Sequence, residues 1–164
     1  GEPVGTIHHH GGGKIALFHQ TVARRADTLS RDRLESLARI LTDGEPSLEL
    51  VLAAFMRPFF DLSAQDPRWR DYARLVAFVS ADVRWRDISA ECFDPVADVF
   101  LQEITRLLRD KTRKQIAEGF VFSVSAMLAL LTSQDRMGTL AAATDADGTE
   151  VAHLIRFCAA GLRA

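Results

Sequence analysis

The chain has 164 residues, of which 48% are hydrophobic and 26% charged, and its formal net charge at pH 7 is −2. This length and apolar content fit one packed domain with a sizeable core and exclude a disordered chain. The slight acidity excludes a self-sufficient nucleic-acid binder, because such a domain carries a basic patch. Only the first 40 residues are mildly basic, and the remainder is acidic.

Cysteine usage and hydropathy indicate the compartment. Cys92 and Cys158 lie far apart in apolar surroundings, with no Cys or His at metal-ligand spacing, so buried free thiols in a reducing cytoplasm are expected. No charged segment leads into an apolar signal core, and no uncharged apolar run reaches the roughly 20 residues that a bilayer requires. We therefore expect a cytoplasmic protein without a membrane partner.

The hydrophobic periodicity is helical throughout, which predicts an all-α fold of about six helices. The first complete helix is expected to start after Gly13 and to stop near Gly44, since glycine commonly ends helices. Ser47 is expected to cap the second helix, which Pro58 should bend or end. The pair Asp66-Pro67 resembles a cap and first-turn proline for the third helix.

Later elements follow from the same signals. A fourth helix is predicted over residues 89–108, interrupted or kinked by Pro95, and a fifth over residues 113–132. A final helix is expected to start near Thr149. Residues 133–148 are small, polar and glycine-containing, which predicts a mobile loop.

Residues 6–18 read TIHHHGGGKIALF, a pattern interpreted as the end of a DNA-recognition helix, a glycine turn and the start of a long helix. It resembles the closing segment of the helix-turn-helix in the TetR family of bacterial repressors, which has a pattern like IYYHFGSKEALF. His9 and His10 fall on the Tyr-His positions, and Lys14 falls on the lysine. The resemblance implies that residues 1–18 end an incomplete helix-turn-helix domain and that residues 19–164 form a ligand-binding and dimerisation domain.

Two positions depart from the family pattern, since Gly11 replaces an aromatic residue and Ile15 replaces an acid. By the resemblance, the residues near operator DNA are Thr6, His9, His10 and Lys14, with Lys14 contacting a phosphate. The alternative interpretation of three histidines and three glycines is a tag and linker. A metal site is not expected, because consecutive histidines point in divergent directions, and no cofactor is expected.

The segment from Gly119 to Leu131 contains no charged residue, which predicts a helix covered on all sides and favours oligomerisation. Small side chains at helical spacing would let a second helix approach closely. The alternative is a single central core helix. The TetR resemblance implies a homodimer in which the last two helices of each protomer form a four-helix bundle. The interface residues expected on these helices are Gly119, Ser123, Ala126, Leu130, Leu154, Phe157 and Cys158.

Large adaptable side chains in the middle of the chain are typical of apolar ligand pockets, although such residues also fill ordinary cores. The residues expected to bind a small hydrophobic effector are Phe55, Met56, Phe59, Tyr72, Val76, Phe100, Phe120 and Met127. Candidate polar contacts are Arg57, Tyr72, Arg74, Ser123 and Ser125.

The segments 47–58, 72–76 and 93–100 resemble the effector domain of the PsrA-like branch of the family, which responds to fatty acids. A fatty acid or other acyl compound is therefore the implied effector, with Arg57 or Arg74 meeting its carboxylate. A flat aromatic ligand would suit the same pocket.

Signals for catalysis are poor. The sequence contains no nucleophile elbow, phosphate-binding loop, dinucleotide fingerprint or paired-cysteine motif. Acids at 91, 94, 98 and 103 come without a Glu-x-x-His motif, so a di-iron bundle is not expected. The TetR resemblance implies a ligand-responsive transcriptional repressor, and with no catalytic motif an enzyme is not expected; the alternative is a helical small-molecule-binding or dimerisation module that does not bind DNA.

Overall fold

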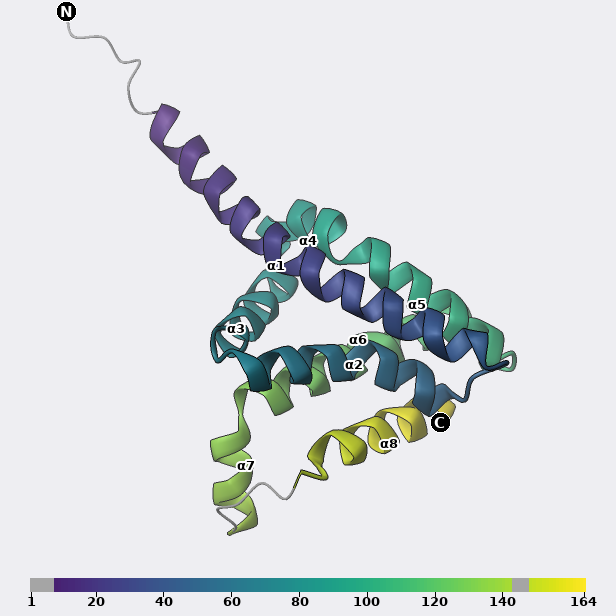
Figure 1. Ribbon diagram of the computed structural model, residues 1–164. Coiled ribbons are helices and arrows are strands. Elements are labelled where there is room, and N and C mark those ends of the chain that lie inside the picture. The colour runs from purple at the N-terminus through teal and green to yellow at the C-terminus, as the bar shows by residue number, and fades with distance from the viewer. Residues whose placement is uncertain (1–7, 143–147) are drawn as a thin grey trace, which may run out of the picture.

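The computed structural model describes residues 8–142 and 148–164, with side chains from residue 12 onward. The described part is helical and contains no strand (Figure 1), which confirms the predicted all-α fold. It has more helices than the six expected, because the fourth is divided and a short one lies within the predicted loop. The elements are α1 (His8–Thr42), α2 (Leu48–Gln65), α3 (Arg68–Ala81), the 3₁₀ helix η1 (Val83–Trp85), α4 (Arg86–Cys92), α5 (Asp94–Leu107), α6 (Arg113–Thr132), α7 (Gln134–Ala141) and α8 (Glu150–Arg163).

Helix α1 begins at His8, so the prediction that it starts after a glycine turn is wrong. Neither Gly12 nor Gly13 has a positive φ angle, and glycine disfavours a helix interior by only about 1 kcal/mol without forbidding it. The far end was predicted correctly: α1 ends at Thr42, and Gly44 follows with φ of 118°. The N-terminal part of α1 projects beyond the rest of the molecule (Figure 1).

The predicted caps of α2 and α3 are confirmed. Ser47 Oγ accepts a hydrogen bond from the Leu50 backbone N–H at 3.2 Å, and Asp66 Oδ1 accepts one from the Arg68 backbone N–H at 3.0 Å. Pro58 does not end α2, which continues to Gln65. Because Pro58 is buried against the core, tertiary packing holds the helix together despite the hydrogen bond that proline removes.

The predicted interruption near Pro95 is confirmed, since α4 ends at Cys92 and Pro95 lies in the first turn of α5. The predicted loop over residues 133–148 is wrong where α7 forms. None of the α7 residues is buried, so the segment lacks the apolar stripe by which a helix is recognised in a sequence. Residues 143–147 of that prediction lie outside the described residues.

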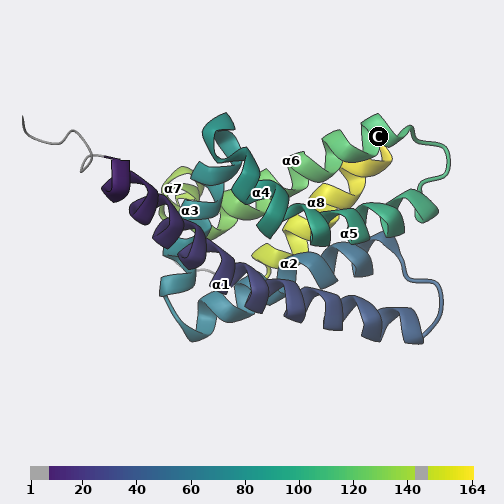
Figure 2. The same ribbon diagram turned by 90° about the horizontal axis from the view of Figure 1, so that it is seen from above.

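The helices are arranged in layers: α1, α4 and α5 run along one side of the molecule, α2 and α6 lie beneath them, and α8 lies below α2 and α6 (Figures 1 and 2). Helix α2 packs against α1 and α8, and α6 packs against α8, α3 and α5. One hydrophobic cluster runs through these layers. By length and composition, α6 could also cross a membrane, with a mean hydropathy of 1.5; core helices share that property, and α6 is packed by three others.

Candidate functional site

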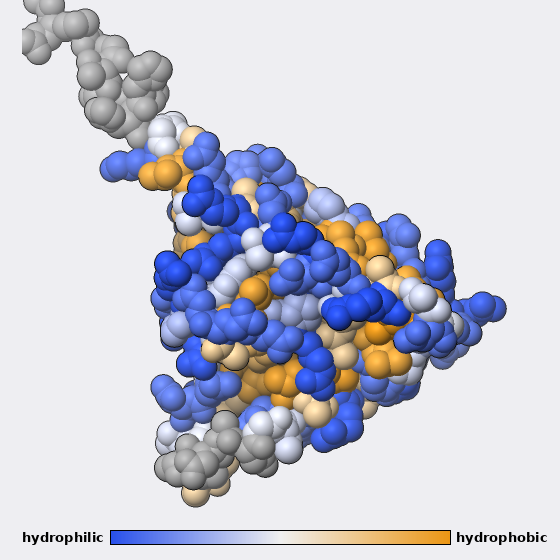
Figure 3. Space-filling model, viewed as in Figure 1, coloured by the Kyte–Doolittle hydropathy of each residue, from blue (hydrophilic) through white to orange (hydrophobic). Residues whose placement is uncertain are grey.

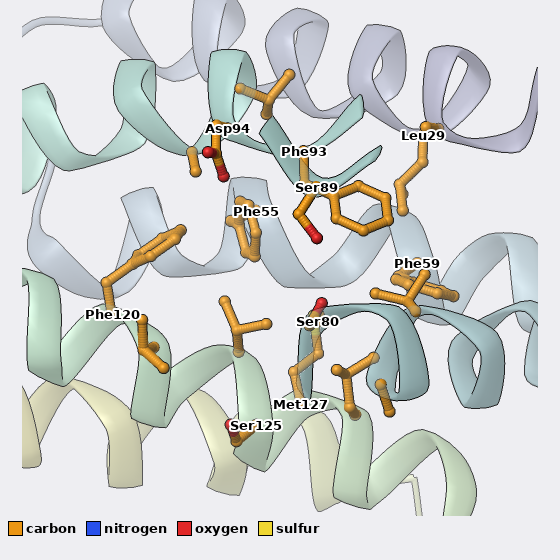
Figure 4. Close-up of a pocket in the computed structure, with 18 of the residues that line it drawn as sticks. Leu29, Phe55, Phe59, Ser80, Ser89, Phe93, Asp94, Phe120, Ser125 and Met127 are labelled. Carbon is orange, nitrogen blue, oxygen red and sulfur yellow. The ribbon is translucent and has the colours of Figure 1, made fainter. Parts of the chain in front are cut away.

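A cavity of about 940 Å³ lies among α1, α2, α3, α4, α5 and α6. Its volume falls at the upper end of the roughly 300–1,000 Å³ that small-molecule sites occupy. Most of its lining is apolar, and aromatic side chains from α2 and α6 and the α4–α5 junction surround it: Phe55, Phe59, Phe93 and Phe120 (Figure 4). The space is therefore suited to a molecule with a large hydrocarbon or aromatic part.

The structure places six of the eight residues predicted to bind an effector at this cavity: Phe55, Phe59, Tyr72, Val76, Phe120 and Met127. The other two, Met56 and Phe100, are fully buried in the core and do not line it. Phe100 instead supports the wall, since its ring meets that of Phe55 edge-on with centroids 5.0 Å apart. Such edge contacts hold Phe55 in one orientation.

Some of the predicted polar contacts line the cavity and others do not. Tyr72 and Ser125 line the cavity, and the Tyr72 hydroxyl donates to the Val22 carbonyl at 3.3 Å. Burial raises the pKa of Tyr72, so this group remains a neutral phenol. Ser123 is buried elsewhere and donates to the Gly119 carbonyl at 2.7 Å.

Neither predicted arginine faces the cavity. Arg57 is exposed on α2, because a residue two positions from Phe55 lies on a different face of the helix. Arg74 is exposed on α3 and pairs with Asp71 at 2.8 Å. Arg57 and Arg74 therefore do not reach this cavity, and the expectation that one of them meets a ligand carboxylate there is wrong.

The cation at the cavity is Arg33 of α1, which the sequence reasoning missed. It lies three, four and seven positions from three other lining residues, Ser30, Leu29 and Ala26, and so shares their helical stripe. That spacing is the signal available in the sequence, but α1 is rich in arginines, so the residue type alone does not distinguish Arg33 from the others.

The Arg33 guanidinium is held between α2 and α6. Its Nε donates to the Phe55 carbonyl oxygen at 2.8 Å, and its Nη2 lies 3.7 Å from Met127 Sδ. The guanidinium carbon is 3.8 Å from the centroid of the Phe55 ring and 5.7 Å from that of Phe59. Burial lowers the pKa of Arg33 to about 9, and the nearby Tyr72 raises it in part, so the group remains a cation at neutral pH.

The remaining polar groups of the cavity come from other helices. Asp94 and Asp98 belong to α5 and are exposed at the cavity. Ser89 lies with Asp94 at the α4–α5 side, whereas Ser80 and Ser125 approach from α3 and α6 (Figure 4). Among the residues that the structure describes, no group of three His, Cys, Asp or Glu side chains is placed to hold a metal ion.

The predicted interface residues divide into buried and exposed sets. Gly119 and Ser123 face α8 of the same chain, and a Cβ atom on Gly119 would lie 2.6 Å from Leu162 Cδ2. The second helix expected against this stripe is thus supplied within the chain. Leu130, Leu154 and Cys158 are likewise buried and Ala126 is half-buried, whereas Phe157 is 67% exposed.

A second exposed aromatic residue, Phe122 of α6, was not predicted and is 69% exposed. It lies one residue from the small stripe and therefore on a different face of α6. Apolar residues also reach the surface over α2 and α8, on a face that is otherwise mostly hydrophilic (Figure 3). Each of the two helices predicted to form the interface therefore carries an exposed aromatic side chain.

The family model of the tetracyclin repressor-like C-terminal domain matches residues 53–161, which is more than half of the chain. The chain belongs to this tetracyclin repressor-like family. The matched residues contain most of α2 and all helices from α3 to α7, together with nearly all of α8. A search of curated proteins found no match.

Tetracyclin repressor-like domains are regulatory and not enzymatic. Their family generally dimerises and binds DNA and small ligands. In this tetracyclin repressor-like chain, most of the cavity lining lies within the matched residues, whereas Arg33 and the other α1 residues of the wall precede them.

Proposed function

We propose that the chain is the effector-binding and dimerising part of a transcriptional repressor, with the cavity as its effector site. The observation that carries the proposal is the cavity of about 940 Å³ inside a regulatory fold. Its apolar lining suits a small hydrophobic effector such as a fatty acid or other acyl compound. Such a regulator acts in the cytoplasm, where both its DNA and its metabolites are found.

The way in which α1 contributes to the cavity supports a regulatory mechanism. Ala26, Leu29, Ser30 and Arg33 place the middle of α1 in the wall, and the N-terminal part of the same helix extends away from the body. A ligand that binds one position of α1 more tightly than another shifts the population toward that position. The shift changes the distance between two DNA-binding heads.

The DNA contacts remain part of this proposal. Lys14 is exposed on the projecting part of α1, as a phosphate contact requires. Thr6 lies outside the described residues, and the side chains of His9 and His10 lie outside them as well. We propose that these four residues adjoin operator DNA.

The proposed homodimer uses the outward surface of α6 and α8. Phe122 and Phe157 are both more than half exposed, and exposed aromatic side chains at the surface favour a partner protein. Pairing α6 and α8 with the same helices of a second copy gives a four-helix interface about a two-fold axis.

A fluorescence titration with N-phenyl-1-naphthylamine, a neutral apolar probe, tests the cavity. Val124 lines it from α6, so Val124→Trp should fill part of the space and weaken probe binding. Val83 is 69% exposed on η1 and does not line the cavity, which makes Val83→Trp the matched control. Absence of probe binding to the unmodified chain, or equal binding by both variants, would contradict the proposed effector site.

A further inference from the structure

Arg33 is the one cationic side chain among the described residues that line the cavity. No carboxylate of the described residues forms an ion pair with it: the cavity acids Asp94 and Asp98 are in neither an ion pair nor a hydrogen bond with Arg33. Arg33 is half-buried, and a cation that is partly removed from water is unfavourable unless an anion compensates it. The protein therefore holds a charge at its cavity without supplying the counter-charge.

The hydrogen-bonding capacity of Arg33 is also only partly used. A guanidinium has five N–H donors, and the described contacts use Nε toward Phe55 and Nη2 toward Met127. The Met127 thioether is a weak acceptor. Donors therefore remain for a ligand on the same planar group.

The orientation of this group is fixed before a ligand arrives. The Phe55 carbonyl holds Nε, and the Phe55 ring lies against the guanidinium at 3.8 Å. Stacking on an aromatic face and a hydrogen bond through Nε leave little freedom to the arginine fork. A ligand that uses the fork does not have to order it, so less entropy is lost on binding.

We propose that the cavity selects an apolar monoanion, a molecule with a carboxylate and a hydrocarbon or aromatic body, and that Arg33 is the residue that binds the carboxylate. This inference rests on the proposed effector-binding function of the same cavity. A planar carboxylate matches the arginine fork through two parallel N–H···O bonds. The rest of the cavity is mostly apolar and accommodates the body of the ligand.

The charges of the lining favour a single negative charge. No second described cation lines the cavity to neutralise a dianion such as a phosphate ester. Asp94 and Asp98 are exposed on α5, where water screens them, and they oppose a carboxylate that approaches their side. The carboxylate is therefore directed to Arg33, with the hydrocarbon toward the aromatic walls.

Displacement of N-phenyl-1-naphthylamine by decanoate, decanol and decylamine tests this assignment, because the three competitors share one hydrocarbon chain and differ in charge. On the unmodified chain, decanoate should displace the probe at a concentration about tenfold lower than decanol, as expected for one charge-assisted bidentate contact. Decylamine should be the weakest competitor, because its positive charge is repelled by that of Arg33.

Two variants of Arg33 and one control isolate the contact. Arg33→Met removes the charge and should eliminate the preference for decanoate over decanol while leaving decanol within about twofold of its original value. Arg33→Lys keeps a cation and should retain part of the preference. Arg57→Met makes the same substitution at an exposed site outside the cavity and should change neither competitor.

The outcomes separate the two proposals. Equal displacement by decanoate and decanol on the unmodified chain would overturn the anion assignment while the cavity still binds the probe, and it needs no variant to fold. An unchanged preference in Arg33→Met would overturn the role of Arg33. Strongest displacement by decylamine would assign the site to a cation through Asp94 and Asp98. No probe binding at all would instead contradict the effector site itself.

Discussion

Gly119 of α6 lies so close to Leu162 of α8 that a Cβ atom on the glycine would be 2.6 Å from Leu162 Cδ2 and 3.3 Å from its Cγ. Leu162 is buried, so it has little room to move away. The glycine therefore permits the close approach of two helices that bound the proposed dimer surface. Any larger residue at this position must displace α8 or its side chains.

Replacing Gly119 with valine should lower the free energy of unfolding by about 1–3 kcal/mol, because overpacking forces neighbours out of their preferred positions. Chemical denaturation monitored by circular dichroism would measure the change. Leu162→Ala removes the atoms that clash, so the double variant should be more stable than the sum of the two single effects predicts. Strict additivity would show that Leu162 is not the residue that restricts position 119.

The ion pair between Glu49 of α2 and Arg163 of α8 should give the protein acid-sensitive stability. Both Arg163 Nη atoms bind the carboxylate, at 2.5 and 2.8 Å, and the Arg163 hydrogen bonds lower the pKa of Glu49 from 4.5 to about 2. A carboxyl group whose pKa is lower in the folded state than in the unfolded state stabilises the fold at pH values above its unfolded pKa. This stabilisation is lost as the pH falls from about 4.5 to about 2. Because both side chains are more than a third exposed, the contribution should be only about 0.5–1 kcal/mol.

The free energy of unfolding of Glu49→Gln should be measured between pH 7 and pH 2.5 and compared with that of the unmodified chain. The variant should be less stable at pH 7, and this difference should diminish as the pH falls. Glu118→Gln is the control, since Glu118 forms an exposed pair with Lys114 within α6 at 3.5 Å. A constant difference across the pH range would exclude the ion pair as its cause.

Charges on the outward surface of α6 and α8 should separate the proposed dimer. Phe122→Glu and Phe157→Glu each place a carboxylate where an aromatic side chain is more than half exposed, and a buried unpaired charge opposes association. Sedimentation velocity should show monomers. Phe78→Glu, at a position of α3 that is 51% exposed, should remain dimeric; if all three variants sediment alike, the interface lies elsewhere.

Binding of decanoate should weaken as pH rises through about 9, where Arg33 loses its proton. A bound carboxylate favours the charged guanidinium, so affinity is retained below this pH and falls above it. Burial raises the pKa of both Tyr72 and Cys92. Calorimetric titration between pH 7 and pH 10.5 should show the loss for decanoate and none for decanol.

Local chain signals were sufficient to predict most of the helical boundaries. Ser47 and Asp66 each cap a helix as expected, and Pro95 divides the predicted fourth helix. Ser47 and Asp66 act through hydrogen bonds to backbone N–H groups two or three residues away, and Pro95 acts through its own backbone geometry, so all three signals are local in the sequence. The short helix from Gln134 to Ala141 was not predicted, because it buries none of its residues and therefore has no apolar stripe.

Positions that depend on three-dimensional packing were less predictable. Arg33 and Arg57 are both arginines on amphipathic helices, and only the crossing of α1 over α2 brings Arg33 to the cavity. The stripe of Gly119 and Ser123 correctly indicated a close helix contact, but spacing alone cannot say whether the second helix belongs to the same chain. Here α8 fills that place.

Because α1 is long, a small tilt at the cavity displaces its N-terminal end by a much larger distance. Arg33 lies about 25 residues from the start of the helix at His8, which corresponds to roughly 37 Å at 1.5 Å per residue. A tilt of about 5° around Arg33 therefore displaces the far end by about 3 Å, comparable to the 3.4 Å rise of a base pair in DNA. In the proposed repressor, an adjustment no larger than a side-chain rearrangement at the cavity would therefore shift the DNA-binding end of α1 by about one nucleotide step.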